Sequence, residues 1–368
     1  WRIPETLEGP DCIKKLPARI KKDGFHKVLV VTDAVLMKLG ALNGLFAAMD
    51  EAGIAYTIYD KAEPNPTDIH VNNGVDLYKA SGCECMIAFG GGSPMDCAKA
   101  AGARVMNPNQ SVSQMRGELK IRHKLPPFFA VPTTAGTGSE TTLAAVVTNM
   151  QTHEKYAIND PKLRPKYAVL DPELTTGLPQ KITSTTGMDA LTHAVEAYIG
   201  LSGTKSTNDY AEKATKLIFE NLETAYNDGK NLQARENMLV ASFYAGMAFT
   251  RAYVGYVHAI AHNLGGIYGT PHGLANAVIL PHVLEYYGDT AYEKLAKLAE
   301  IVGIGGYSQA DKEMNRNMNI PEHFDFIKDE DIPTIVERAL KEGNPLYPVP
   351  KIMDAKDCEK VIKAVRGF

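Results

Sequence analysis

The sequence has few cysteines, no long apolar run and no block of like charges. Its five cysteines are scattered, and none forms the Cys-x-x-Cys spacing of a structural zinc site, so we expect reduced thiols. No apolar run reaches the roughly 20 residues that cross a bilayer, and no charged segment followed by an apolar signal core stands near the beginning. We therefore expect a cytoplasmic protein that does not enter a membrane.

Charge and length further restrict the class of protein to which this chain can belong. The net charge is only −4, and charged residues make up 22% of the chain, so neither nucleic acid nor an anionic membrane is an expected partner. Hydrophobic residues make up 45% of the 368 residues. That length supports two domains of ordinary size, each with its own core, and excludes a single small binding module.

The first half of the chain alternates short β-branched apolar runs with helical patterns. Such alternation is typical of βαβ units and a parallel sheet. We predict an α/β, Rossmann-like dinucleotide-binding domain over residues 1–179. Its expected strands are Lys27–Thr32, Ile54–Tyr59, Cys85–Phe89, Phe128–Val131 and Tyr167–Leu170.

Beyond Pro179 the apolar pattern changes to helical periods, as in Asp209–Tyr226 and Ala234–Thr250. We predict that residues 180–368 form an all-α domain. Within it, His282 follows Pro281, and we expect this histidine to cap or pack at a helix start.

Two loops of the first half have the composition of nucleotide-binding turns. GGGSPMD, from Gly90, lies between a predicted strand and a predicted helix, where backbone amides and the helix dipole suit a pyrophosphate, although a plain tight turn is the alternative. TTAGTGS, from Thr133, also follows a strand and offers hydroxyls to phosphate or ribose. Asp33 ends another strand, where it can bind an adenosine ribose and repel a 2′-phosphate, or simply cap a helix. Together these features favour NAD over NADP.

The second half concentrates histidines beside one carboxylate. Asp189 and His193 are four residues apart on a predicted helix, and His258 and His262 repeat that spacing on another. His272 follows a Gly-Thr-Pro turn that can return the chain to the same point. A lone histidine on an apolar helix is usually a core residue, but this clustering favours a metal site. Asp189, His193, His258 and His272 form a ligand set suited to Fe(II), Zn(II), Co(II) or Mn(II).

The motifs GMDALTHAVEAY, from Gly187, and GYVHAIAHNLGGIYGTPHGLANAVILPH, from Gly255, resemble those of the iron-containing (group III) alcohol dehydrogenase family. The resemblance extends over nearly the whole chain, through EPNPT, GGGSPMDCAKA, TTAGTGSE and DPELTTGLP. It implies NAD and one divalent metal, most often Fe(II), as cofactors. It also implies metal ligation by Asp189, His193, His258 and His272, and a catalytic role for His262.

The resemblance also implies where NAD binds. Asp33 would lie at the adenosine ribose, Gly91, Gly92 and Ser93 at the pyrophosphate, and Thr133, Thr134, Thr137 and Lys155 near the nicotinamide. Two departures from the family pattern concern the substrate. The segment from Gly303 to Asp311 is short, and Leu143 and Ala144 are apolar where some members have a polar residue, which favours plain aliphatic alcohols over diols.

These features predict hydride transfer between a primary alcohol, or a short diol, and NAD in a cleft between the two domains. A bound metal would act as a Lewis acid on the alcohol oxygen, and His262 could pass the hydroxyl proton to water. Phe249 could line the substrate pocket or pack in the core. Two alternatives remain: a polyol or glycerol-type dehydrogenase of a related fold, and a catalytically idle metal-binding assembly protein. We expect a homodimer or a larger homo-oligomer.

Overall fold

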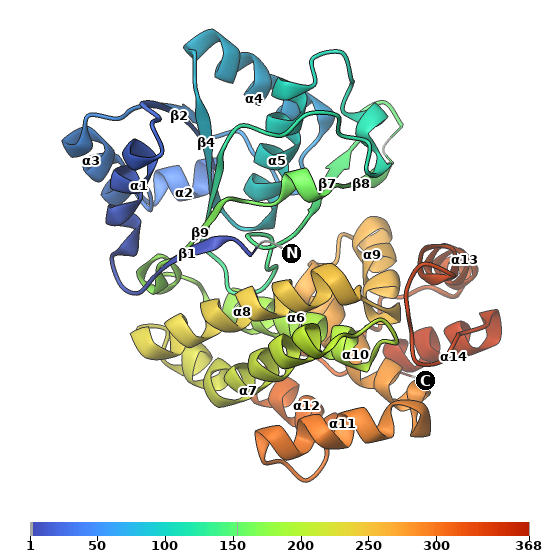
Figure 1. Cartoon of the computed structure of the whole chain (residues 1–368). Coiled ribbons are helices and arrows are strands. Elements are labelled where there is room, and N and C mark those ends of the chain that lie inside the picture. The colour runs from blue at the N-terminus through green and yellow to red at the C-terminus, as the bar shows by residue number, and fades with distance from the viewer. Residues whose placement is uncertain (1–2, 153, 368) are drawn as a thin grey trace. The chain divides into compact units, whose positions relative to one another are not determined.

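The structure is a computed structural model that describes residues 3–152 and 154–367. The described chain divides into two compact units. The N-terminal unit runs to Thr134 and resumes over Gly138–Thr176, and the C-terminal unit comprises Ala135–Thr137 and the chain from Gly177 onward. Figure 1 shows strands only in the blue-to-green part of the chain and helices in the yellow-to-red part.

The N-terminal unit is built around a parallel sheet of six strands, in the order β1-β9-β6-β4-β2-β3. All five predicted strands are present, which confirms the α/β fold class with a helical second part. The strands are β1 (Glu5–Glu8), β2 (Lys27–Val31), β3 (Ala55–Tyr59), β4 (Cys85–Gly90), β6 (Phe128–Pro132) and β9 (Tyr167–Leu170).

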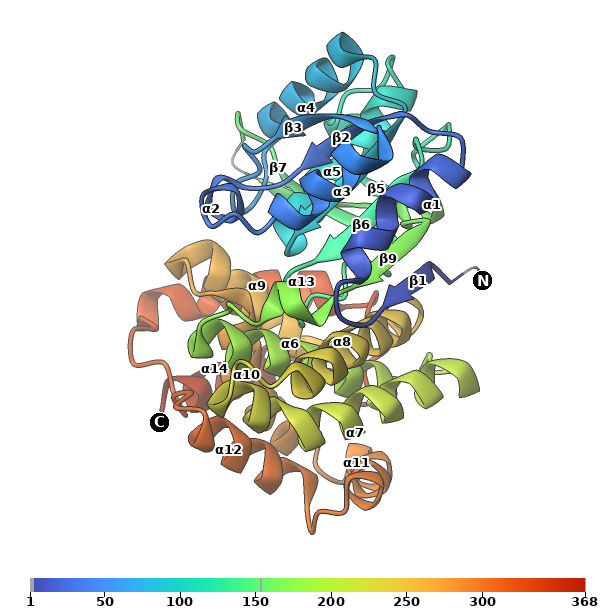
Figure 2. The same cartoon turned by 90° about the vertical axis from the view of Figure 1, so that its left-hand side faces the viewer.

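Helices cover both faces of this sheet. Successive side chains of a strand point to opposite faces, so one strand packs against both helix layers. In β2, Val28 and Val30 pack in a core with α1 (Leu16–Lys22) and α3 (Asn43–Ala52). Leu29 and Val31 pack in a second core with α4 (Asp68–Ser81) and α5 (Gly92–Met106). Both layers can be followed in Figure 2. A strand buried on both faces explains the continuous apolar runs in the sequence.

A second, three-stranded sheet was not predicted. It consists of β5 (Gly117–Glu118), β8 (Lys155–Asn159) and β7 (Ala144–Thr148), with β7 and β8 antiparallel. Burial alternates along β7 and β8, and β5 has only two residues, so these strands differ from β2, β4 and β6, which are buried on both faces. The pairing of β7 with β8 supplies the backbone partners that neither segment finds locally.

The C-terminal unit contains no strand among the described residues. Long helices follow one another through short connections, and Figure 1 shows α6, α7 and α8 packed side by side. The helices are α6 (Gln180–Ile199), α7 (Lys205–Asn227), α8 (Leu232–Ala252), α9 (Tyr256–Tyr268), α10 (His272–Tyr287), α11 (Asp289–Val302), α12 (Tyr307–Asn317), α13 (Ile332–Gly343) and α14 (Ala355–Arg366).

The two helices predicted by periodicity are present and slightly longer than expected. Thr204 begins α7 with a capping box, and the side chain of Asn231 accepts a hydrogen bond from the backbone of Ala234 at the start of α8. These caps satisfy backbone N–H groups that have no partner within the helix.

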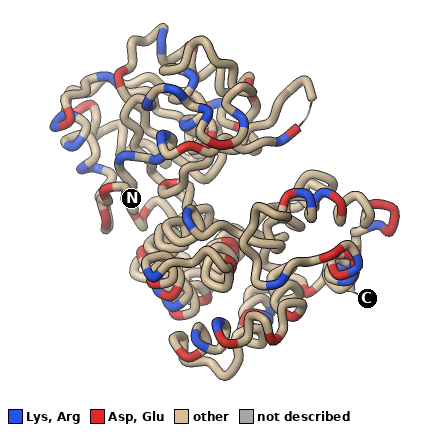
Figure 3. Tube along the Cα trace, turned by 45° about the vertical axis from the view of Figure 1, so that its right-hand side comes forward, with Lys and Arg blue, Asp and Glu red and all other residues tan. Residues whose placement is uncertain are grey.

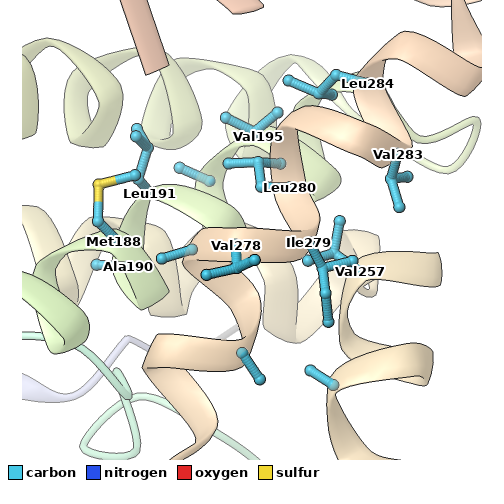
Figure 4. Close-up of a cluster of buried hydrophobic side chains, with 14 of the residues drawn as sticks. Met188, Ala190, Leu191, Val195, Val257, Val278, Ile279, Leu280, Val283 and Leu284 are labelled. Atoms are coloured by element: carbon cyan, nitrogen blue, oxygen red, sulfur yellow. The ribbon is translucent and has the colours of Figure 1, made fainter. Parts of the chain in front are cut away.

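One apolar core joins the helices that carry the predicted metal ligands. Figure 4 shows side chains of α6, α9 and α10 in contact, among them Leu191, Val257 and Leu280. Each of these three side chains is at most 1% exposed. The same core therefore fixes the relative positions of α6, α9 and α10.

The expectation that His282 lies at a helix start is wrong. Pro281 lies inside α10, which continues from His272 to Tyr287. Proline removes one intrahelical hydrogen bond, but the helix is held on both sides of it by the buried side chains of Leu280 and Val283. His282 instead lies on the side of the helix, with Nε2 3.3 Å from the carbonyl oxygen of Glu322.

Candidate metal centre and nucleotide-binding loops

The first two predicted ligands lie one turn apart on α6. Asp189 and His193 are 2% and 5% exposed, on a helix that is almost wholly buried from Thr183 onward. The His193 ring stacks on Phe249 of α8, with ring centroids 4.2 Å apart, and on His258 of α9 at 4.6 Å. A carboxylate and an imidazole are thus fixed by packing inside the C-terminal unit.

The start of α10 comes unusually close to α6. Gly273 lies so near Thr185 that an added Cβ atom would be 2.2 Å from the Thr185 carbonyl oxygen. Only glycine allows this approach, which sets the neighbouring His272 beside Asp189. The Nε2 atom of His272 is 3.5 Å from Oδ1 of Asp189.

One ligand atom from each of Asp189, His193, His258 and His272 lies within 4.8 Å of all the others. Nε2 of His258 is 3.9 Å from Oδ1 of Asp189. Metal bonds of roughly 2.0–2.2 Å to nitrogen and oxygen place neighbouring donors about 3–4 Å apart, so this spacing fits one divalent ion. One carboxylate and three imidazoles suit Fe(II) or Zn(II) better than Mg²⁺.

Burial favours the neutral form of His193 and His258, which is the form that binds metals. Loss of hydration lowers the pKa of His258 well below 6.5, and the neighbouring His193 and His272 lower it further. Burial also lowers the pKa of His193, although Asp189 opposes that change. Neutral imidazole offers a nitrogen lone pair, whereas imidazolium does not.

Glu196, which the sequence analysis missed, lies behind His258. Its carboxylate accepts hydrogen bonds from the backbone N–H groups of Gly255 and Val257, each at 2.8 Å, and Oε2 is 2.6 Å from Nδ1 of His258. Burial raises the pKa of Glu196 to about 8, while these hydrogen bonds act against the rise. A charged residue three positions after His193, in the otherwise apolar segment from Ala194 to Ile199, was the available sequence signal.

Asn276 is a second residue that the sequence analysis missed. Its Nδ2 atom donates to Oδ1 of Asp189 at 2.7 Å and lies 3.2 Å from Nε2 of both His258 and His272. The side chain is fully buried. Because Asn276 follows His272 by four residues, both side chains leave the same face of α10.

His262 lies at the edge of the cluster, with its side chain 45% exposed. Its ring stacks on His272 at a centroid distance of 5.2 Å and meets His258 edge-on at 6.0 Å. It is not one of the four residues whose donor atoms converge. Phe249 is half-buried and contacts His193, so it lies beside the same cluster.

The nucleotide loops of the N-terminal unit lie at one edge of its sheet. β2, β4 and β6 are adjacent and parallel, so their carboxyl ends coincide. Asp33, Gly91 and Thr133 follow these three ends directly or within two residues. In open α/β sheets this edge, where the strand order reverses, is the usual ligand site.

Asp33 does cap a helix. Its Oδ1 accepts hydrogen bonds from the backbone N–H groups of Val35 and Leu36, both at 2.9 Å, at the start of α2 (Ala34–Lys38). The other carboxylate oxygen is not used by the cap, so capping is compatible with the expected contact to a ribose.

The glycine loop leads directly into a helix. Gly91 is the N-cap of α5, and Gly92 and Ser93 form its first turn, so their backbone N–H groups have no partner within the helix. Gly90 has φ 147°, and a Cβ atom there would be 2.7 Å from Pro94. The turn therefore requires glycine, and its amides are available to an anion.

The threonines and lysine expected near nicotinamide occupy different environments. Thr133 is buried, and its backbone N–H donates to the carbonyl of Gly90 at 3.1 Å, which ties the two loops together. Thr134 is half-buried beside Gly91, and Thr137 belongs to the C-terminal unit. Lys155 is exposed and donates to Oδ1 of Asn65 at 2.6 Å.

A buried lysine that the sequence analysis did not identify links the glycine helix to the threonine loop. Nζ of Lys99 on α5 donates to the carbonyl oxygens of Ser139 and Ala144 and to the hydroxyls of Ser139 and Thr142, at 2.7 to 3.1 Å. Burial lowers its pKa to about 8, and Asp96 opposes this change. The network holds the two loops in a fixed relation.

Charges of both signs are intermixed along the described chain in Figure 3. The described helices include none that is both long and apolar enough to cross a membrane.

Known proteins resemble this chain over almost its full length. The family profile "Iron-containing alcohol dehydrogenase" matches residues 4–172, and "Fe-containing alcohol dehydrogenase family, C-terminal" matches residues 183–366. The 1,3-propanediol dehydrogenase of Klebsiella pneumoniae is 43% identical, over 91% of this chain and 90% of that protein. The NAD-dependent methanol dehydrogenase of Bacillus methanolicus is 36% identical, over 98% and 97%. The crystal structure of a 1,3-propanediol oxidoreductase has a TM-score of 0.96 at 39% identity and covers 99% of both chains.

Proposed function

This chain belongs to the iron-containing alcohol dehydrogenase family, and we propose that it interconverts primary alcohols or short diols and the corresponding aldehydes, with NAD as hydride acceptor. The observation that carries the proposal is the convergence of Asp189, His193, His258 and His272 within 4.8 Å. We assign these four residues to one divalent metal, Fe(II) first and Zn(II) as the alternative. The bound metal supplies Lewis-acid activation of the alcohol oxygen.

The residues around the metal have separate roles in this proposal. His262 lies beside the four donors with nearly half of its side chain exposed, so it can reach the substrate hydroxyl and move its proton. Phe249 contacts His193 and would form part of the substrate pocket. Both assignments rest on geometry within the C-terminal unit.

The proposed NAD site belongs to residues 1–179, and the proposed metal and substrate site to residues 180–368. Asp33 would bind the adenosine ribose, and Gly91, Gly92 and Ser93 the pyrophosphate, because they lie together at the carboxyl edge of the sheet. Thr133, Thr134, Thr137 and Lys155 would contact the nicotinamide half. The NAD dependence of the Bacillus methanolicus relative supports this cofactor.

The proposed substrate is either a plain primary alcohol or a short diol. The relatives named above act on methanol and on 1,3-propanediol, which supports short primary substrates of both kinds. Ala144 begins β7 and Leu143 directly precedes it, and their apolar side chains still favour plain alcohols in our prediction.

The test is NADH formation from a panel of methanol, ethanol, longer primary alcohols, 1,3-propanediol and glycerol. Chelator-stripped protein receives Fe(II) anaerobically, Zn(II), or no metal. Activity restored by a metal supports the proposal and identifies both ion and substrate. Activity with glycerol alone would favour the polyol dehydrogenase. Bound metal without NAD binding would favour the idle assembly protein.

Assembly and location belong to the same proposal. We expect a homodimer or a larger homo-oligomer in the cytoplasm, where the five cysteines, all buried, remain reduced. Light scattering of the metal-loaded protein measures the assembly, and a monomeric mass would contradict it.

A further inference from the structure

A carboxylate from the far end of the chain contacts His262. Oε1 of Glu342, on α13, lies 2.7 Å from Nδ1 of His262, 80 residues away in sequence. The hydroxyl of Tyr347 donates to the same oxygen at 2.8 Å. The three side chains therefore form a chain of hydrogen bonds that ends on the residue proposed to move the substrate proton.

The backbone holds Glu342 in place. Gly343 ends α13 against the ring of Tyr256 on α9, and a Cβ atom there would lie 2.8 Å from Cε1 of that ring. The Tyr256 hydroxyl donates to Oδ1 of Asn344 at 2.6 Å. This close approach fixes the end of α13 against the helix that carries His262, so the contact does not depend on two freely moving surface side chains.

The Tyr347 hydroxyl keeps its proton at ordinary pH and can therefore donate to the Glu342 carboxylate. Burial, with the nearby carboxylate of Glu342, raises its pKa well above 10. A permanent donor on one side of Oε1 orients the carboxylate, and its remaining lone pair then faces Nδ1 of His262.

We propose that Glu342 is a positioning residue for His262: it binds the Nδ1–H group and thereby leaves the lone pair on Nε2. Neutral imidazole by itself favours the opposite tautomer, with the proton on Nε2, and a carboxylate at Nδ1 reverses that preference. The carboxylate also restrains the ring, which is 45% exposed, in the orientation that stacks on His272. This inference rests on the proposed function, because it concerns how His262 serves alcohol oxidation.

The opposing interpretation is that Glu342 only tethers α13 to α9. A double-mutant cycle separates the two. Glu342→Leu should lower kcat about 10- to 100-fold, with KM and metal content nearly unchanged, because a misplaced proton acceptor affects turnover more than binding. Glu342→Gln, whose amide oxygen still accepts from Nδ1–H, should lose only a few-fold. Glu337→Leu, which removes an exposed carboxylate from the same helix, is the matched control and should match the parent.

In the His262→Ala background, Glu342→Leu should have no further effect on kcat, because its route to the reaction is gone. An equal loss of kcat in both backgrounds, or no loss in either, would overturn the proposal. If Glu342→Leu does not fold, as circular dichroism would show, Glu342→Ala takes its place in the same cycle.

A second measurement does not depend on the enzymatic activity of the protein. ¹⁵N-histidine labelling of the metal-free protein at mildly alkaline pH reports which ring nitrogen of His262 carries the proton, and the signal is assigned by its absence in His262→Ala. We expect protonated Nδ1 in the parent and a shift toward protonated Nε2 in Glu342→Leu. The same tautomer in both proteins contradicts the inference. If the parent oxidises no alcohol with any metal, the proposed function fails, while this spectrum still decides whether Glu342 sets the tautomer.

Discussion

Glu196 and His258 stand 62 residues apart in sequence and meet in the buried interior, where Oε2 of the acid lies 2.6 Å from Nδ1 of the imidazole. The carboxylate is itself fixed by two backbone N–H groups at the start of α9. A carboxylate on the rear nitrogen of a histidine determines which nitrogen faces a metal and increases its basicity. The contact therefore orients His258 for its proposed role as a metal ligand.

Glu196→Gln should therefore weaken metal binding about 10- to 100-fold, because it alters the hydrogen bond that orients the His258 ring. Competition with a chromogenic chelator measures the affinity for Fe(II), Zn(II) or Co(II). Glu293→Gln, an exposed substitution on α11, is the control. Unchanged affinity in Glu196→Gln would show that the contact does not tune the site.

The four proposed ligands and His262 should behave differently when removed. His193→Ala and His258→Ala should lose metal and activity together, because each removes a donor from the cluster. His262→Ala should keep its metal and turn over slowly, by about 100-fold or more. Metal analysis alongside initial rates distinguishes the two classes, and equal metal loss in all three variants would refute this division of roles.

Gly273→Ala should damage the metal site without replacing a ligand. The new methyl group would meet the Thr185 carbonyl, so the start of α10 must move away from α6 and carry His272 with it. We expect weaker metal binding and a loss of roughly 1–3 kcal/mol in the free energy of unfolding. Gly266→Ala is the matched control, because a Cβ atom on that helical glycine meets nothing within 4 Å, and it should leave the affinity unchanged.

Two substitutions of Asp33 distinguish the effect of its capping hydrogen bonds from the effect of its negative charge. Asp33→Asn keeps an oxygen for the N–H groups of Val35 and Leu36 but removes the charge that repels a 2′-phosphate, so the preference for NAD over NADP should fall about 10-fold. Asp33→Ala should show the same change and also lose about 1 kcal/mol of stability. Steady-state kinetics with both cofactors, beside thermal unfolding, tests the pair. An unaltered cofactor preference in both would place the ribose elsewhere.

Asp311 should make stability depend on pH. Its side chain is fully buried, its carboxylate oxygens have no hydrogen-bond partner among residues 3–152 and 154–367, and burial raises its pKa from 3.8 to about 8. A raised folded-state pKa means that the protonated acid stabilises the fold fully below about pH 4, and that this contribution is lost as the pH rises to about 8.

Asp311→Asn removes that dependence. The difference in the free energy of unfolding between variant and parent should grow in favour of the variant by at most about 1.4 kcal/mol per pH unit across this window. Urea unfolding of the metal-free proteins at several pH values measures it, with the exposed Asp325→Asn as control. Parallel curves for Asp311→Asn and its parent would show that Asp311 does not titrate in this range.

Much of the fold could be predicted because its signals are local. The central strands of the main sheet, β2, β4 and β6, are buried on both faces, so they leave continuous apolar runs, as in Lys27–Val31. In the second sheet β7 and β8 are only half-buried, although they lie close together in the sequence, so Ala144–Thr148 gives a weaker strand signal than Lys27–Val31 does. Pro281 lies within α10 and not before a helix, because tertiary packing overrides the local preference of proline against a helix interior.

Some residues of the candidate site could likewise be predicted from the local sequence, and others could not. Helical periodicity alone places Asp189 with His193 and His258 with His262, and the residues of the glycine loop specify a turn before a helix. Glu196 and Asn276 lie within one turn of a proposed ligand and left a readable signal. Glu342 left none, because its only relation to His262 is a contact across 80 residues.

The sequence by itself determined the secondary structure that carries the chemistry, since hydrophobic period, turn residues and i, i+4 spacing act over a few residues. Only the tertiary structure decided which side chains meet: three histidines and an aspartate from α6, α9 and α10 at one point, and a carboxylate behind each of His258 and His262. The reason is physical. Burial of apolar faces is non-directional and fixes helices by shape, so close approaches such as Gly273 on Thr185 and Gly343 on Tyr256 exist only once the core is packed.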